Sequence, residues 1–132
     1  MQTRDQRYAR HAYERITALR EAKLDHKRYG VLALKLPALI RTAGLAQATA
    51  FVEARGKAEG KQLLKDLAET LGFREWNAFG REIRESNVMT YLSLTRRTLA
   101  ALVWYKRFAQ SVLNVSGTEG FDDEREDAGE SA

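Results

Sequence analysis

The sequence predicts an all-α protein: a compact bundle of about six helices with a long C-terminal helix and a disordered acidic tail. Three observations indicate this class. Apolar residues recur three and four positions apart through most of the chain, which is the period of a helix that buries one face. No run of four to eight residues alternates apolar and polar side chains as a strand would. A single proline among 132 residues leaves long helices uninterrupted.

The chain is long enough for one domain, which we place over residues 1–113. Its first helix is predicted over residues 4–28, with one apolar stripe made of Ala9, Ala12, Ile16 and Leu19. Residues 31–43 are apolar on nearly every side, which indicates a central and buried segment. Pro37 should end or kink this segment near Leu36, unless it stands in the first turn of a helix that begins there.

Three shorter helices are predicted to follow Gly44, which is a plausible helix stop. The first covers residues 45–55 and should bury Leu45, Ala48, Phe51 and Val52. A glycine-containing loop then leads to a helix over about residues 59–71, which should bury four leucines, Leu63, Leu64, Leu67 and Leu71. A short helix is predicted from the spacing of Trp76, Phe79 and Ile83.

The last helix is predicted over about residues 87–113, roughly 40 Å long, with Ser86 or Asn87 as its N-cap. One face carries Val88, Tyr91, Leu92, Thr95, Leu99, Leu102, Val103, Ala109 and Leu113. Lys106 lies at the centre of this face, where a buried ammonium group would need a partner or a route to solvent. The opposite face carries Arg97, Ala101, Trp104 and Phe108. A helix with two apolar-containing faces is either sandwiched within the fold or contacted by another protein.

Charge divides the chain into two parts. Residues 1–118 hold 21 Lys and Arg against 11 Asp and Glu, whereas residues 119–132 hold one Arg against seven acids. Arginine, which binds phosphate through two hydrogen bonds, supplies 15 of the 22 bases. The basic body is compatible with a nucleic-acid partner and equally with cationic faces that meet only solvent. The tail, residues 114–132, is rich in Ser, Gly, Glu and Asp and is predicted to be disordered.

Several function classes are excluded by what the sequence lacks. It holds no cysteine, so disulfides, thiolate metal sites and thiol catalysis are ruled out, and a reducing cytoplasm is indicated. No phosphate-binding glycine loop, nucleophile elbow or metal-ligand spacing is present. His11 and His26 are about four turns apart on the one predicted helix and cannot meet a single metal ion. We therefore expect no enzyme activity, no catalytic residue, no metal and no cofactor. The N-terminus is too polar for a signal peptide, and no apolar run is long enough to span a membrane.

Three stretches together carry a resemblance to a known family: residues 29–51, 85–95 and 99–109. The matching residues are Tyr29, Gly30, Leu36, Pro37, Leu39, Ile40, Gly44, Leu45 and Gln47, followed by Tyr91, Leu92, Leu94, Thr95, Trp104, Lys106, Arg107, Phe108 and Ala109. In this order and combination, the chain resembles the small, all-helical subunit of type III-B CRISPR effector complexes, the Cmr family. The likeness leaves out only the acidic tail.

The resemblance implies a non-catalytic subunit of an antiviral ribonucleoprotein. In such complexes several copies stack beside the backbone subunits that hold the guide RNA. Together these subunits line a basic groove that receives the target RNA as it pairs with the guide. The implied partners are therefore the other Cmr subunits, further copies of this chain, the guide RNA and the target RNA, with neither a membrane nor a small-molecule substrate.

Candidate site residues come from the resemblance and from charge. The resemblance marks Gln47, Lys106 and Arg107 by position, and we assign Gln47, Trp104 and Phe108 to subunit contacts. Arg4, Arg7 and Arg15 share one stripe of the first predicted helix with His11. The predicted RNA-binding residues are Arg4, Arg7, Arg15, Arg41, Arg81, Arg84, Arg96, Arg97, Lys106 and Arg107.

Two alternatives remain open from the sequence. A helical DNA-binding regulator would place a recognition helix in the major groove, but the candidates at residues 31–43 and 45–55 are apolar or alanine-rich, and Arg41 alone could reach a base edge. A protein-only helical adaptor would use its cationic faces only as a solvated surface. Binding to RNA would distinguish the RNA-holding subunit that the resemblance implies from the protein-only adaptor.

Overall fold

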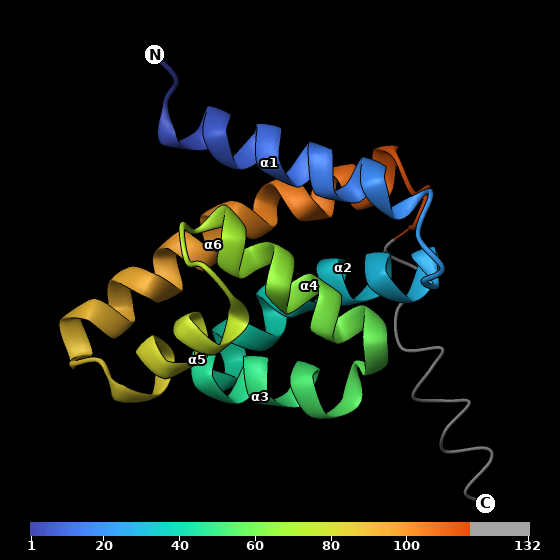
Figure 1. Ribbon diagram of the computed structural model, residues 1–132. Coiled ribbons are helices and arrows are strands. Elements are labelled where there is room, and N and C mark those ends of the chain that lie inside the picture. The colour runs from blue at the N-terminus through green and yellow to red at the C-terminus, as the bar shows by residue number, and fades with distance from the viewer. Residues whose placement is uncertain (117–132) are drawn as a thin grey trace, which may run out of the picture.

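A computed structural model describes residues 1–116 and confirms the all-α class, since this part of the chain holds six helices and no strand (Figure 1). The helices are α1 (Arg4–Leu19), α2 (His26–Ala43), α3 (Leu45–Arg55), α4 (Lys57–Thr70), α5 (Trp76–Glu85) and α6 (Val88–Ser111). Most of the predicted acidic tail, residues 117–132, lies outside the described residues. Among residues 1–116, no helix combines the length and apolar character needed to cross a membrane.

Helix α4 lies at the centre of the bundle and contacts α1, α2, α3, α5 and α6. Helix α1 lies along the second half of α6, above the layer formed by the shorter helices (Figure 1). The core holds large, fully buried side chains from all six helices, including Ile16, Tyr29, Leu45, Leu63, Phe79 and Tyr105. The predicted leucines of α4 are buried, as are Phe79 and Ile83 of α5.

The prediction of one helix over residues 4–28 is wrong, because the chain leaves the helix after Leu19 and starts a new one at His26. Asp25 is the N-cap of α2, and its side chain accepts a hydrogen bond from the backbone N–H of Arg28 at 3.1 Å. Aspartate in this position satisfies a backbone donor that the helix leaves unpaired. His11 and His26 therefore belong to two different helices.

Helix α2 runs through Pro37 to Ala43, so this proline neither ends the helix nor stands in its first turn. Proline at an interior position removes one backbone hydrogen bond. Here Leu36, Pro37 and Ile40 are all buried, and their packing in the core offsets that loss. The sequence correctly indicated a central, buried segment; the predicted helix end or helix start at Pro37 is wrong, and the predicted kink stays a prediction.

Helix α3 depends on α6 for its N-terminal cap. Gly44, with φ of 90°, joins α2 to α3 and has no side chain that could cap the new helix. The hydroxyl of Tyr91 in α6 accepts a hydrogen bond from the backbone N–H of Ala46 at 3.0 Å instead. Leu45, Ala48 and Val52 are buried as predicted, whereas Phe51 is 38% exposed, which contradicts its predicted burial.

Helix α6 is confirmed as the longest, with Asn87 as its N-cap, and its buried residues include members of both apolar-containing faces. These buried residues are Leu94, Thr98, Ala101, Leu102, Tyr105 and Ala109. Val88, Leu92 and Val103 of the first face are exposed, and so is Lys106. Thr98 and Tyr105 can be buried because their hydroxyls bond to the Leu94 carbonyl and to Thr70.

The packed body continues past the predicted boundary at residue 113. Val115 is 3% exposed, and its N–H donates to the carbonyl of Ala109 at 3.1 Å. The Val115 side chain lies against Gly30 of α2, where even one added methyl group would overlap it. Gly30 therefore allows a close approach that fixes the chain after α6.

Candidate nucleic-acid interface

A buried polar network holds α2 against α4. The hydroxyl of Tyr29 donates a hydrogen bond to Asp66 at 2.6 Å, and the side-chain amide of Gln62 donates to the same carboxylate at 2.8 Å. Asp66 is 1% exposed, and burial raises the pKa of its carboxyl group despite the two donors. These contacts lie within the core, so they stabilise the bundle and offer no surface to a ligand.

A second network joins α1 to α4 and α6. Thr70 of α4 is hydrogen-bonded to Tyr105 of α6 and to the His11 ring of α1. Arg15 forms an ion pair with Glu69 at 2.9 Å. Burial lowers the pKa of His11, with a smaller contribution from the Arg15 charge, so the neutral ring is favoured. His11 and Arg15 of the predicted cationic stripe therefore lie in the contact between α1 and α4.

The structure separates the predicted RNA-binding residues into two groups. Arg15 and Arg97 are engaged within the molecule, because Arg97 donates to the carbonyl of Leu71 at 2.7 Å, at the end of α4. Arg81 is exposed and lies 4.0 Å from Glu85 on its own helix, a weak contact at such exposure. The remaining residues of the set are exposed: Arg4, Arg7, Arg41, Arg84, Arg96, Lys106 and Arg107.

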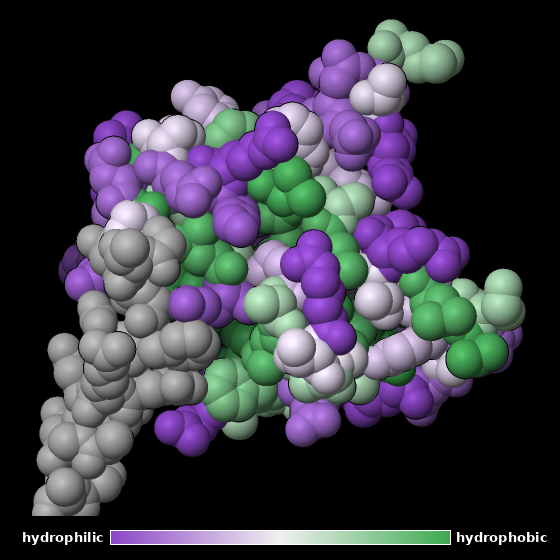
Figure 2. Space-filling view, turned by 180° about the vertical axis from the view of Figure 1, so that it is seen from behind, coloured by the Kyte–Doolittle hydropathy of each residue, from purple (hydrophilic) through white to green (hydrophobic). Residues whose placement is uncertain are grey.

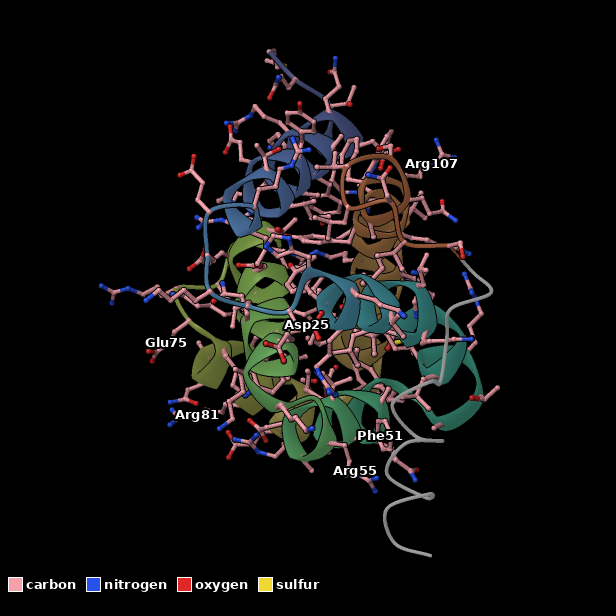
Figure 3. All side chains as sticks on the ribbon, turned by 90° about the vertical axis from the view of Figure 1, so that its right-hand side faces the viewer. Asp25, Phe51, Arg55, Glu75, Arg81 and Arg107 are labelled. Atoms are coloured by element: carbon pink, nitrogen blue, oxygen red, sulfur yellow. The ribbon has the colours of Figure 1, made fainter. Side chains whose placement is uncertain are left out.

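These exposed cations do not form a single patch. Figure 3 shows Arg107 on α6 and Arg81 on α5 at opposite ends of the molecule. Arg4 and Arg7 lie on α1, the helix that packs along α6. Helices α2 and α6 each carry four bases and no acidic residue, and on α6 the exposed ones are Arg96, Lys106 and Arg107. A phosphate backbone would meet no carboxylate of α6 itself.

An aromatic cluster lies where α1 meets the second half of α6. The rings of Tyr13 and Phe108 meet edge to face, with centroids 5.3 Å apart, and Phe108 stacks on Trp104 at 6.0 Å. The Arg107 guanidinium lies over the Trp104 ring, 5.3 Å from its centroid. Trp104 and Phe108 were predicted to contact another subunit, and Arg107 was predicted to bind RNA. The structure brings all three side chains together in this one cluster.

Sequence reasoning missed two contributors to the surface. The first is Tyr13, which is not among the predicted site residues, because nothing local indicated that Phe108, distant in sequence, would meet it. The second is an apolar patch in the first turns of α6, made of Val88, Met89 and Leu92, which are 68%, 69% and 44% exposed. Figure 2 shows apolar surface at the end of the molecule where α6 begins. Gln47 is exposed in the first turn of α3, next to Ala46, whose N–H donates to the Tyr91 hydroxyl of α6.

Comparison with known proteins gives a consistent match over nearly all the described residues. Residues 4–112 match the model of a family described as CRISPR-associated protein (Cas_Cmr5). The chain is similar to the CRISPR system Cmr subunit Cmr5 of Thermus thermophilus, with 48% identity over 115 residues, which is 86% of this chain and 98% of that protein.

A solved structure shows the same fold. The crystal structure of a CRISPR-associated Cmr5 family protein from Thermus thermophilus superposes with a TM-score of 0.78 at 46% identity. The match covers 86% of this chain and 99% of that one. The stretches at residues 29–51, 85–95 and 99–109 all lie within the matched family region.

Proposed function

The chain belongs to the CRISPR-associated Cmr5 family, the small helical subunits of type III-B Cmr effector complexes, and from this premise we propose that it holds target RNA paired to guide RNA through a basic surface. In this proposal the chain is a non-catalytic subunit that works in the cytoplasm. The observation that carries it is the acid-free α6, whose exposed Lys106 and Arg107 lie on a body with 21 bases and 11 acids before residue 119.

The mechanism needs only fixed positive charge. Guanidinium and ammonium groups neutralise phosphates and release the counterions condensed on the nucleic acid, which favours binding without reading the bases. Sequence would then be supplied by pairing between guide and target, as in other RNA-guided complexes. No covalent bond forms or breaks on this chain, so it needs no nucleophile, general base or metal.

The exposed bases of α1 and of the second half of α6 are the first candidates for phosphate binding. Arg4 and Arg7 lie on α1, and Lys106 and Arg107 lie on α6. Arg41, Arg84 and Arg96 are further exposed candidates on other parts of the surface, and Arg81 shares its charge with Glu85. Arg15 and Arg97 contribute indirectly, because their side chains hold α1 and α6 against α4.

We place contacts with other Cmr subunits, and with further copies of the chain, at the apolar patch of Val88, Met89 and Leu92 and at Gln47. Exposed aliphatic side chains grouped at one end of a helix are typical of a surface that another protein covers. This assignment moves the main subunit contact away from Trp104 and Phe108 to the opposite end of α6.

The direct test is filter binding of the full chain to two RNA oligonucleotides of unrelated sequence over a range of salt concentrations. We expect weak binding with little sequence preference, and a logarithmic affinity that falls linearly with the logarithm of salt concentration. Arg4→Glu with Arg7→Glu should weaken binding on the order of ten-fold or more, because each reversal replaces attraction by repulsion.

The matched control reverses two exposed bases elsewhere, Lys61→Glu with Arg74→Glu, and has the same net charge. If the control weakens binding as much as the α1 variant, only net charge matters and the proposed surface is wrong. Equal affinity of the wild type and the α1 variant would exclude Arg4 and Arg7.

A further inference from the structure

We propose that Arg107 and Trp104 form a stacking site for an unpaired base of single-stranded RNA. Phe108 packs on the indole ring of Trp104, and Tyr13 packs on Phe108, so these two rings hold the indole in place. This inference rests on the proposed RNA-holding function and adds a ligand chemistry to it: a flat aromatic base together with its phosphate. It assigns one role to side chains that the sequence had divided between RNA and subunit contacts.

The first argument is the geometry of the cation. The guanidinium of Arg107 lies over the Trp104 ring at 5.3 Å, and Arg107 is an exposed residue. A guanidinium held against an indole has already lost much of its rotational freedom. A base that stacks on the solvent-facing side of the guanidinium therefore does not have to order this side chain on binding. Nucleobases stack both on aromatic rings and on arginine planes.

The second argument is the support beneath the plane. Trp104 stacks on Phe108 at 6.0 Å, and Phe108 receives the edge of Tyr13 at 5.3 Å. Because Tyr13 belongs to α1 and the other two rings to α6, the cluster is fixed by two helices that pack along each other. Tyr13 is itself 51% exposed, so the cluster presents aromatic surface on α1 as well as on α6.

The third argument is charge. Arg107 is exposed and supplies the cation of the cluster, whereas Lys106 is exposed on the opposite face of α6 from Trp104. Glu14 is the carboxylate next to Tyr13 in sequence, and it pairs with Arg10 at 3.4 Å. Because α6 carries no acidic residue, a phosphate attached to the stacked base would meet the Arg107 charge without a carboxylate of the same helix.

RNA fits this end of α6 better than a protein partner does. Tryptophan and arginine are common in both kinds of interface, but an exposed arginine on a helix without an acid suits a polyanion. The other end of α6 has the opposite character, since Val88, Met89 and Leu92 expose aliphatic surface. The two ends of one helix thus present surfaces for two kinds of partner.

The experiment follows the fluorescence of Trp104 in the full chain. Trp76→Phe removes the only other tryptophan, which lies on α5 and donates to Glu53. We expect a short oligouridylate to quench the remaining fluorescence in a saturable manner.

Two variants test the stacking in a second measurement. Arg107→Lys keeps the charge and removes the planar guanidinium, and Trp104→Leu keeps an apolar side chain and removes the ring. In filter binding with Trp76 intact, each should weaken affinity on the order of ten-fold. Arg74→Lys is the matched control and should change nothing.

Three results would overturn the proposal, and circular dichroism must show that each variant keeps its helices. If Arg107→Lys and Trp104→Leu bind as tightly as the wild type while the salt dependence persists, stacking is wrong and the RNA-holding function stands. If the wild type binds no RNA at low salt, both proposals fail. If the two variants keep RNA affinity and instead lose co-purification with the other Cmr subunits, the cluster is a protein contact.

Discussion

At the scale of single residues, Asp66 shows how the core uses polar groups. Its carboxylate is 1% exposed and accepts hydrogen bonds from Tyr29 and Gln62, which lie on α2 and α4. Desolvation raises its pKa, and the hydrogen bonds only partly oppose that shift. The folded state therefore favours the protonated acid more than the unfolded chain does, so stability at this site depends on pH.

The sign of that dependence gives a testable prediction. A group whose pKa is higher in the folded state than in the unfolded chain adds to the free energy of unfolding. This contribution is complete at pH values below the pKa of the unfolded chain, and it is lost as the pH rises through the pKa of the folded state. The side chain in Asp66→Asn cannot ionise. As the pH rises from about 4 to 8, the free energy of unfolding of the wild type should therefore fall relative to that of the variant. Urea unfolding across this range measures the difference.

His11 titrates in the opposite direction, because its lowered pKa makes stability fall on acidification. Both proteins retain His11, so its effect cancels in the comparison. A difference between Asp66→Asn and the wild type that stays constant across the pH range would contradict the assignment of a raised pKa to Asp66.

Individual site residues were only partly predictable, for a physical reason. Arg4, Arg15 and Arg97 look alike in the sequence, yet Arg15 pairs with Glu69 and Arg97 binds the Leu71 carbonyl. Both partners come from α4 and its C-terminal end, and only the tertiary arrangement brings them close. Local patterns show that a residue is charged, but they do not show which charges the fold itself uses.

At the scale of elements, the helices of this bundle complete one another. The Tyr91 hydroxyl caps α3 from α6, because Gly44 offers no side chain at the usual capping position. In the same way, Arg97 of α6 binds the carbonyl of Leu71 at the end of α4. Two helix ends are thus satisfied by side chains distant in sequence.

Tyr91→Phe tests the shared cap. Removing the hydroxyl leaves the Ala46 N–H without its partner and should lower the free energy of unfolding by about 1 kcal/mol, the usual cost of a lost helix cap. Tyr13→Phe is the matched control, since the contact of Tyr13 with Phe108 is made by its ring. Equal stability of Tyr91→Phe and the wild type in urea unfolding would show that the cap contributes nothing.

The existence of the helices was largely predictable, whereas one boundary and one buried face were not. The leucine pattern of α4 and the Asn87 cap of α6 are strong local signals, and both are confirmed. The break before Asp25 was missed because polar residues surround that cap. The sequence did not show which side of α6 is buried, because Thr98 and Tyr105 are buried with their hydroxyls hydrogen-bonded inside the molecule and neither belongs to the two apolar-containing faces.

At the scale of the whole molecule, the two ends of α6 differ in chemistry. The first end exposes aliphatic side chains. The second end carries the rings of Trp104 and Phe108, with Arg107 over Trp104, and the exposed Lys106. Membership of the Cmr5 family makes the chain a subunit among other subunits, so a surface for neighbours is required as well as any surface for RNA. The family match gives no support to a helical DNA-binding regulator.

The aliphatic end supplies a prediction about assembly. Val88→Glu with Leu92→Glu should sharply reduce co-purification of the chain with the other Cmr subunits, because two charges would have to be buried in the contact. The helical circular dichroism signal should be unchanged, since both side chains are exposed. Lys61→Glu with Arg74→Glu adds the same number of acids elsewhere and should co-purify normally. Normal assembly of the Val88 and Leu92 variant would place the contact on another surface.

The central claim is that this chain acts by presenting fixed cations to RNA within a larger complex. The most direct measurement is the dissociation constant for target RNA of Cmr complexes reconstituted with guide RNA and either the wild-type chain or Lys106→Glu with Arg107→Glu. We predict that both complexes assemble and that the variant complex binds target on the order of ten-fold more weakly, with a smaller dependence on salt. Equal affinity and equal salt dependence in two fully assembled complexes would contradict this account.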